Sequence, residues 1–290
     1  MHRAFVLVTG ATRGFGREIA RGLVHATQSP LQSLKQQYPN ITFDLLLTGR
    51  NLQGLSAIRD ELSDRAGFNV DTLVADFADP QADRVTESIV HNIPAAPTDY
   101  SHFFLFNNAG SLGKLARTRD LQWTDIQSAI HVNVAAPLAL TAKLLKVFKD
   151  CPSVDIVNVS SLAAIQEFDC WGLYAAGKAA RDMIHKTIAL EEGLIESAQR
   201  PNATEALPRP RVRVLNYAPG PLDTDMQAEI RKDMPAVELR DLFVDMKTKG
   251  TLVDPTESAL TLLHLLSKPD GFVSGSHVDY FDVGSSDGSA

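Results

Sequence analysis

Short apolar runs alternate with longer amphipathic runs along almost the whole chain. The apolar runs are rich in Val, Leu, Ile and Phe and predict β-strands at Phe5–Thr9, Phe43–Thr48, Val70–Ala75, Phe103–Phe106, Val154–Val159, Val212–Tyr217 and His277–Phe281. The runs between them have a helical period and predict helices at Gly14–Ala26, Leu52–Arg65, Gln81–His91, Thr124–Lys149, Leu173–Ile195 and Pro255–Leu266. The alternation therefore predicts an α/β fold, a doubly wound parallel sheet with helices on both faces.

The alternation runs on without an internal repeat or a linker, so we expect a single Rossmann-like domain over residues 1–283. Two stretches interrupt it, Thr27–Ile41 and the Pro-rich Glu196–Arg211, and both are expected to be surface insertions. Residues 284–290 are small and polar and predict a flexible C-terminal tail. In a fold of this kind, ligands bind beyond the carboxyl ends of the strands.

Composition narrows the possible partners. The net charge of −7 argues against a chain-wide basic surface for nucleic acid or for an anionic membrane. Two cysteines cannot build a disulfide framework or a Cys-based zinc site, and no metal is expected. The sequence contains no continuous apolar run long enough for a membrane span, so we expect a soluble, cytoplasmic protein.

Glycines follow the first predicted strand with the spacing G-x-x-x-G-x-G and open the first predicted helix. Glycine permits a tight turn and a close backbone approach to a pyrophosphate, which the helix N-terminus then faces. The context predicts a nucleotide site, although a glycine-rich turn without a ligand has the same composition. The candidate cofactor-binding residues here are Gly10, Thr12, Arg13, Gly14, Phe15 and Gly16.

The residues after the second predicted strand indicate which dinucleotide binds. An NAD site usually carries a carboxylate there, whereas an arginine suits the 2′-phosphate of NADP. The chain has Arg50 and Asn51 and no carboxylate, and Arg13 lies in the glycine turn, so we expect NADP(H). The alternative is that both arginines are solvated surface residues. Further candidates close later strands: Asp76 and Phe77 near the adenine, and Asn108, Ala109 and Gly110 along the cofactor.

A tyrosine and a lysine four residues apart share one face of a predicted helix. Tyr174 and Lys178 alone are weak evidence, but Ser161 ends the preceding strand and Asn133 lies in an otherwise apolar helix. A tyrosine hydroxyl that an ammonium group acidifies can exchange a proton with a carbonyl oxygen while a nicotinamide exchanges hydride. Ser161 is expected to hold the carbonyl oxygen, and Asn133 to fix a water that resupplies the proton. The structural alternatives are a surface pair, a strand-end serine and a buried amide.

Together, the glycine turn, Asn107–Gly110, Asn133, Ser161, Tyr174 and Lys178 resemble the short-chain dehydrogenase/reductase family over essentially Phe5 to Asp282. Longer strings resemble the pterin-reducing members of that family: Thr9–Gly16, NNAGSLG at 107–113, GKAARDM at 177–183, NYAPGPLDTDM at 216–226 and SGSHVDYFD at 274–282. The resemblance implies NADPH-dependent reduction of pterin side-chain carbonyls. It leaves two alternatives, a reductase of other α-dicarbonyls or aromatic ketones, and an NADPH-sensing protein without turnover.

The same resemblance assigns further residues and a partner. It implies that Lys178, Leu222, Asp223, Thr224, Asp225, Met226 and Gln227 contact the cofactor. It implies that Ser161, Leu162, Tyr174 and Gly220 border the substrate and that Asp279 anchors the pterin through two parallel N–H donors. A strand-end Asp that caps a backbone group is the alternative for Asp279. The apolar stripes of the helices Thr124–Lys149 and Leu173–Ile195 are too wide for one sheet face, and in the family such helices pair in a homodimer.

Overall fold

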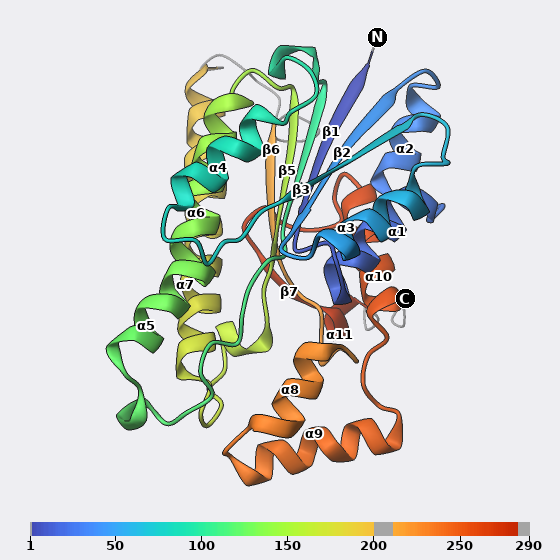
Figure 1. Cartoon of the computed structure of the whole chain (residues 1–290). Helices are drawn as coiled ribbons and strands as arrows, with labels where there is room; N and C mark the ends of the chain where they lie inside the picture. The colour runs from blue at the N-terminus through green and yellow to red at the C-terminus, as the bar shows by residue number, and fades with distance from the viewer. Residues whose placement is uncertain (1, 200–210, 284–290) are drawn as a thin grey trace, which may run out of the picture.

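The computed structural model of the chain describes residues 2–199 and 211–283, and within them the apolar runs form one parallel sheet (Figure 1). Its strands are β1 (Arg3–Thr9), β2 (Thr42–Gly49), β3 (Phe68–Val74), β4 (His102–Asn107), β5 (Ser153–Val159), β6 (Val212–Ala218) and β7 (His277–Asp279). Their order is β3-β2-β1-β4-β5-β6-β7. The first three strands are added toward one edge of the sheet and the last four toward the other, so the switch point lies between β1 and β4. The predicted single doubly wound sheet is confirmed, and the switch point is where such folds bind ligands.

Helices cover both faces of this sheet (Figure 1). One face carries α1 (Gly14–His25), α2 (Pro30–Gln37), α3 (Leu52–Leu62) and α10 (Pro255–Ser267); the other carries α4 (Ala82–His91), α6 (Ala136–Val147) and α7 (Gly172–Gln199). Short 3-10 turns lie at Pro97–Asp99, Thr118–Asp120 and Leu162–Ala164. A separate apolar cluster, which includes Trp171, Tyr174 and Phe243, lies beneath the carboxyl end of the sheet.

The helix predicted over Thr124–Lys149 is interrupted. It consists of α5 (Trp123–Ile130), a π-helical turn at His131–Ala135, and α6. Pro137 explains the interruption, because proline has no N–H for the carbonyl four residues earlier, which is that of Asn133, and its ring clashes with that carbonyl. The run Trp123–Val147 is long and apolar enough to cross a membrane by length and composition. Its residues Leu140 and Leu144 are nevertheless fully buried against the sheet, so the core of the domain accounts for much of this apolar character.

Three further predictions need correction. Thr27–Ile41 is not merely a surface insertion, because Ser29 caps α2 and Leu31 is fully buried in the core. The last strand ends at Asp279, and a short helix, α11 (Tyr280–Val283), follows it. Two unpredicted helices, α8 (Asp225–Asp233) and α9 (Val237–Lys249), cross below the carboxyl end of the sheet (Figure 1).

Parts of two predictions cannot be compared with the structure. α7 continues through Gln199, so the first residues predicted as the Glu196–Arg211 insertion belong to this helix. Residues 200–210 lie outside the described residues, and so does the predicted tail at 284–290.

Candidate functional site

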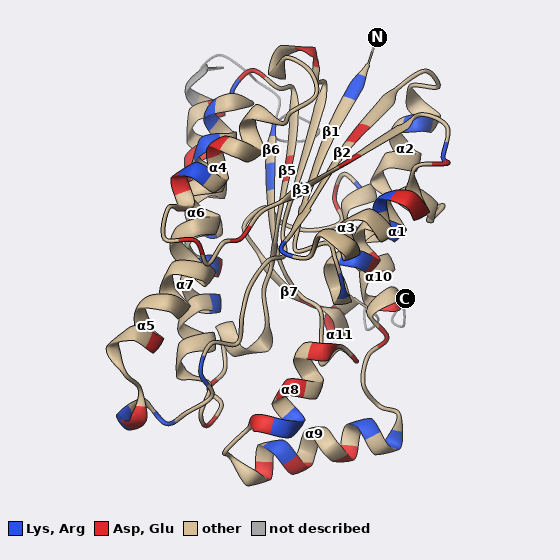
Figure 2. Ribbon diagram, viewed as in Figure 1, with Lys and Arg blue, Asp and Glu red and all other residues tan. Residues whose placement is uncertain are grey.

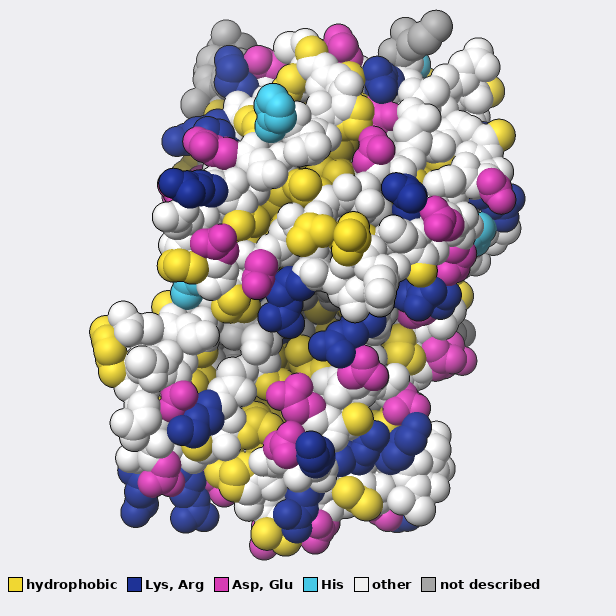
Figure 3. Space-filling model, viewed as in Figure 1, with side chains coloured by type: hydrophobic (Ala, Val, Ile, Leu, Met, Phe, Trp, Pro, Cys, Tyr) yellow, Lys and Arg dark blue, Asp and Glu magenta, His cyan; other side chains and the backbone are white. Residues whose placement is uncertain are grey.

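Most of the predicted site residues come together at the carboxyl ends of β1, β4, β5, β6 and β7. The glycine turn follows β1, Asn108–Gly110 follow β4, Ser161 follows β5, Gly220 follows β6 and Asp279 ends β7. In the space-filling view, Lys and Arg side chains gather at the level between the sheet and the α8–α9 pair (Figure 3). Figure 2 shows that cations and carboxylates are otherwise intermixed on the helices, so a phosphate would meet local rather than global positive charge.

The glycine turn is closely packed. A Cβ on Gly16 would lie 2.3 Å from the carbonyl oxygen of Gly10, so no larger residue fits. Gly10 and Gly14 adopt positive φ angles of 70° and 54°, which glycine tolerates without strain. α1 has no side-chain cap and no acidic residue in its first turn, so its first N–H groups are not blocked by a side chain. The turn thus keeps the features that suit an anion at a helix N-terminus.

The loop after β4 is fastened to this turn. Asn108 donates from Nδ2 to the carbonyl oxygens of Thr9 (2.8 Å) and Gly10 (3.1 Å). Thr9 Oγ1 in turn accepts the N–H groups of Asn108 and Ala109, both at 3.0 Å. The Asn108 side chain therefore joins the ends of β1 and β4, and the N–H of Ala109 is used in the same connection.

The two predicted phosphate ligands differ in their contacts. Arg13 forms an exposed ion pair with Asp225 at 3.0 Å. Arg50 is exposed and makes no hydrogen bond or ion pair within residues 2–199 and 211–283. The loops that carry Arg13 and Arg50 are in contact through the residues before them, because a Cβ on Gly49 would lie 2.6 Å from Thr12 Cγ2. Among the described residues Arg50 is thus free to bind phosphate, whereas Arg13 would have to leave Asp225 to do so.

Four other cofactor candidates have structural contacts of their own. Asn51 caps α3 by accepting the N–H of Gly54 at 3.0 Å, and Asp76 accepts the N–H of Ala78 at 3.0 Å. The side chains of Phe15 and Phe77 are buried in the two cores of the domain. Only the backbone of the two phenylalanines is available to a ligand, and the Asp76 carboxylate closes a turn two residues later, ahead of α4.

The segment from Leu222 to Gln227 crosses the glycine turn. A Cβ on Gly14 would lie 3.5 Å from Thr224 Cγ2, so the two loops are in contact. Leu222 forms a parallel bridge with Val253, and Asp223 pairs with Lys247 at 2.6 Å. Gln227 is 4% exposed, and neither amide atom of its side chain has a partner within the described residues. Met226 packs in the apolar cluster beneath the site.

The candidate catalytic residues are buried side by side. Tyr174 and Lys178 occupy the first turns of α7, and the Lys178 Nζ atom lies 5.4 Å from the centre of the Tyr174 ring. Lys178 Nζ donates to the carbonyl oxygen of Val159 at 2.6 Å. Ser161 Oγ accepts the N–H of Ala163 at 3.2 Å and is hydrogen-bonded to Tyr174. Serine, tyrosine and lysine thus form one cluster at the end of β5.

The electrostatics of this cluster differ from the sequence expectation that Lys178 acidifies Tyr174. Burial raises the pKa of Tyr174, and the hydrogen bond with Ser161 and the charge of Arg181 oppose that rise only partly. Burial also lowers the pKa of Lys178 to about 7, with the charge of Arg181 acting in the same direction. Because much of Lys178 is then neutral near pH 7, it is not the main charge acting on the phenol in this structure.

The side-chain amide of Asn133 fastens a neighbouring loop, and the predicted role of Asn133 in holding a water stays a prediction. Its Oδ1 accepts the N–H of Ser111 and its Nδ2 donates to the carbonyl oxygen of Ser111, both at 2.9 Å. The whole amide is therefore used to fasten the loop after β4. The Asn133 backbone carbonyl lacks the partner that an α-helix would give it, because residue 137 is a proline without an N–H.

The candidate substrate residues border the same edge. Gly220 has a φ of +80°, and a Cβ there would lie 3.1 Å from Val253 Cγ2. Leu162 is 42% exposed beside Ser161. Asp279 pairs with Ala218 across β6 and β7, and its Oδ1 accepts the N–H of Phe281 at 3.0 Å. Its Oδ2 has no hydrogen-bond partner among the described residues, so the carboxylate caps a turn and still has acceptor capacity.

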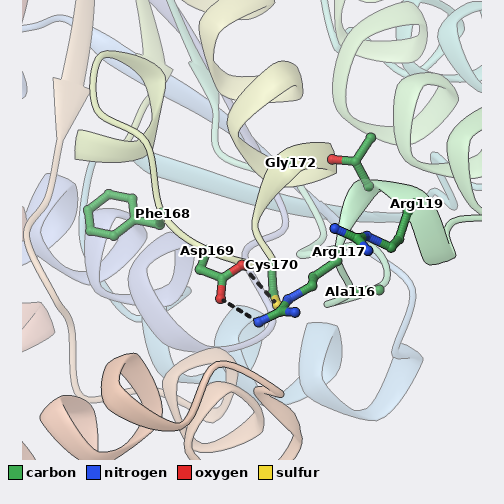
Figure 4. A pocket seen from close by; sticks show the side chains of 8 residues that line it. Ala116, Arg117, Arg119, Phe168, Asp169, Cys170 and Gly172 are labelled. Carbon is green, nitrogen blue, oxygen red and sulfur yellow. Dashed lines mark hydrogen bonds and ion pairs between the residues drawn. The ribbon is translucent and has the colours of Figure 1, made fainter.

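A cavity of about 490 Å³ lies beside this site, at the N-terminus of α7 (Figure 4). Its lining includes Arg117, Arg119, Asp169 and Cys170 and none of the predicted site residues. Arg117 and Asp169 approach to 3.8 Å, and Asp169 accepts from the Cys170 thiol. Cys170 adopts a φ of 66°, which turns the chain sharply just before Trp171 and Tyr174. The cavity therefore lies at the N-terminus of α7 and outside the Ser161–Tyr174–Lys178 cluster.

Comparison with known proteins gives the family. Residues 4–235 match the family model of the short chain dehydrogenases. The chain is 35% identical to a sepiapterin reductase of Bos taurus (97% of this chain and 95% of that protein) and 36% identical to one of Rattus norvegicus (97% of each). It is 28% identical to a benzil reductase of Bacillus subtilis (90% of this chain and 93% of that protein).

Solved structures share the fold. A variant of actinorhodin polyketide ketoreductase with NADPH has a TM-score of 0.69 at 22% identity, covering 96% of this chain and 97% of that chain. A short chain dehydrogenase of Shigella flexneri complexed with NADP has a TM-score of 0.66 at 22% identity, covering 97% and 98%.

Proposed function

Because the chain belongs to the short chain dehydrogenase family of oxidoreductases, we propose that it uses NADPH to reduce the side-chain carbonyl groups of pterins. The proposed reactions are sepiapterin to dihydrobiopterin and 6-pyruvoyl-tetrahydropterin to tetrahydrobiopterin. The observation that carries the proposal is the buried Ser161–Tyr174–Lys178 cluster at the same sheet edge as the carboxylate of Asp279. The sequence similarity to the sepiapterin reductases over nearly the whole chain supports the substrate class.

The residues at the carboxyl edge fit a dinucleotide phosphate. The N-terminus of α1 and the guanidinium of Arg50, which has no partner within residues 2–199 and 211–283, are donors of the kind that phosphate oxygens accept. NADPH, when bound, supplies the hydride. In this proposal Lys178 would hydrogen-bond the nicotinamide ribose, and the segment Leu222–Gln227 would cover the cofactor from above the glycine turn.

The chain's own residues account for the proton. Tyr174 is buried and keeps its phenol protonated at neutral pH, which is the form needed to donate to a carbonyl oxygen. Ser161 lies in hydrogen-bond contact with that phenol and would share the carbonyl oxygen with it, stabilising the charge that develops there. The backbone carbonyl of Asn133, which has no N–H of residue 137 to pair with, is the group that would hold a water near Lys178.

Substrate-dependent oxidation of NADPH tests the proposal. We expect sepiapterin to be reduced with a higher kcat/KM than a simple diketone such as benzil. Benzil deserves this comparison because a benzil reductase is among the relatives, which favours reduction of aromatic α-dicarbonyls as the second candidate function. Faster turnover of benzil would establish that second function, and no turnover of either substrate would reject both.

Arg50 provides a test of the cofactor. Arg50→Asp places a carboxylate where a 2′-phosphate would bind, and we expect the KM for NADPH to rise at least about tenfold while the KM for NADH falls. Steady-state kinetics with both cofactors measure the change. Arg59→Asp, on the exposed surface of α3, is the control for added negative charge. Equal KM values for NADPH in Arg50→Asp and the unchanged protein would remove the argument for NADP.

We also propose a homodimer in the cytoplasm. Large apolar side chains stand exposed on the outer surface of α5, α6 and α7, including Leu138 (39%), Met183 (63%), Leu190 (63%) and Leu194 (62%). Exposed apolar surface on neighbouring helices is what a symmetric helix-to-helix interface buries.

A further inference from the structure

A fully buried arginine lies between the catalytic cluster and the loop after β4. Arg181 is 1% exposed and follows Lys178 by three residues on α7, so Tyr174, Lys178 and Arg181 share one face of the helix. Its Nε donates to Asn158 Oδ1 at 2.7 Å, its Nη1 donates to the carbonyl oxygen of Ala109 at 2.9 Å, and its Nη2 donates to the carbonyl oxygen of Asn107. One guanidinium thus joins α7 to the ends of two strands.

These bonds fix the loop that the proposed cofactor meets. Arg181 holds Asn107 and Ala109, while Asn133 holds Ser111 through both atoms of its amide. Between them, a Cβ on Gly110 would lie 3.2 Å from Asn133 Oδ1 and 3.7 Å from Arg181 Nη1. Arg181 and Asn133 therefore hold the loop from two sides, at Asn107, Ala109 and Ser111.

Arg181 also places a charge beside the acid and the lysine. Its positive charge lowers the pKa of both Tyr174 and Lys178, and burial lowers the pKa of Arg181 itself to about 10, so it stays cationic at neutral pH. The neighbouring His185 is neutral, because burial lowers its pKa to about 4.

The groups that surround Arg181 come from several elements. Asp182 of α7 accepts from Asn158 of β5 at 2.9 Å and bonds His277 Nδ1 of β7 at 2.6 Å. The remaining neighbours in this network are the uncharged amides of Asn107 on β4, Asn133 in the π-helical turn and Asn216 on β6. Asp182, whose charge acts on Arg181, bonds Asn158 and His277, and no hydrogen bond joins it to the guanidinium in the part of the chain that the structure describes.

We propose that Arg181 is a positioning residue of the reaction. It holds the loop 107–111 in place against the cofactor, and it keeps a positive charge next to Tyr174 and Lys178. The proposal rests on the function proposed above. Arg181 thus has two effects, its hydrogen bonds to the loop and its positive charge. Each effect can be removed by a substitution that keeps the other.

Two variants make the separation. Arg181→Lys keeps the charge, but one ammonium cannot reach acceptors on Asn107, Ala109 and Asn158 together. We expect its dissociation constant for NADPH to rise about tenfold with the pH profile unmoved. Arg181→Gln removes the charge and keeps a donor. We expect the alkaline fall of kcat to move up by about half a pH unit or more, because the phenol becomes less acidic.

Arg213 supplies the matched control. It is 3% exposed and donates to Asp155 and to the carbonyl oxygens of Leu266, Lys268 and Pro269, at the opposite end of the strands. Arg213→Lys and Arg213→Gln are expected to lower Tm and to leave NADPH binding and the pH profile unchanged.

Fluorescence titration with NADPH, pH profiles of kcat and thermal unfolding are measured for all four variants. If the Arg181 variants lose only Tm, as those at Arg213 do, the arginine is merely structural and the proposal is overturned. If Arg181→Gln does not fold, the NADPH affinity of Arg181→Lys decides alone. Absence of pterin and diketone turnover in the unchanged protein would reject the proposed function, whereas the NADPH titration would still test the tether.

Discussion

Tyr174→Phe is expected to lower kcat for carbonyl reduction by about three orders of magnitude and to leave NADPH binding within about twofold. A positioned general acid accounts for roughly 10²–10⁴ of rate. Here burial raises the pKa of the Tyr174 phenol, which stays protonated at neutral pH, whereas burial lowers the pKa of Lys178 to about 7. The variant keeps the buried ring, which packs edge-on to Trp171 at 5.4 Å between ring centres, so the fold is expected to survive. Stopped-flow single turnovers and fluorescence titration measure the two effects.

Tyr100→Phe is the matched control for this substitution. Tyr100 is 2% exposed, and its hydroxyl donates to Asp44 Oδ2 at 2.8 Å at the amino end of the sheet. Its loss is expected to cost about 1 kcal/mol of stability without changing kcat. A Tyr174→Phe protein that turned over as fast as the Tyr100→Phe protein would show that the proton comes from another group.

The raised pKa of Tyr174 also determines how the rate of carbonyl reduction depends on pH. Because burial raises the pKa of Tyr174, the donor form persists through neutral pH, and reduction is expected to slow only on the alkaline side. Oxidation of the alcohol needs the phenolate, so its rate is expected to rise over the same alkaline range. At neutral pH the Tyr174 phenol is thus in the protonated form that reduction needs, and not in the phenolate form that oxidation needs.

The sheet could be predicted from the sequence because its strands are apolar on both faces. Strands such as Leu45–Leu47 and Phe103–Phe106 are covered by helices on either side, so all of their residues are buried and apolar. α8 and α9 give a weaker signal, because among their residues only Gln227, Ile230 and Phe243 are buried. α2 was missed for the same reason, since Leu31 and Leu34 are its only buried residues besides Pro30.

The identity of the site residues could be predicted, but much of their chemistry depends on packing. Spacing on a helix places Tyr174 and Lys178 on one face, yet only the structure shows that burial is the largest influence on the pKa of each. The bond between Asn133 and Ser111 could not be predicted, because it joins residues 22 apart in sequence. Arg181 was not singled out, although it lies three residues after Lys178. A charged residue on the apolar, inward face of a predicted helix was the available signal.

The second large effect is expected at Asp279, and it is selective for substrate. Asp279→Asn replaces one carboxylate oxygen by an N–H₂ donor, which would face the N–H donors of the pterin's aminopyrimidinone edge. Hydrogen bonds to a charged group contribute about 1.5–3 kcal/mol each, so losing a bidentate pair is expected to lower kcat/KM for sepiapterin roughly 100-fold or more. Benzil offers no such edge, and its kcat/KM is expected to change by no more than about threefold.

Asp282→Asn separates a specific anchor from a general loss of negative charge. Asp282 Oδ2 accepts the N–H of Asp279 at 3.2 Å, and asparagine keeps an acceptor there while it removes the neighbouring charge. We expect this variant to reduce sepiapterin nearly as well as the unchanged protein. If Asp279→Asn lowers kcat/KM equally for sepiapterin and benzil, the carboxylate only caps the turn before Phe281, and the sheet edge at β7 then carries no pterin specificity.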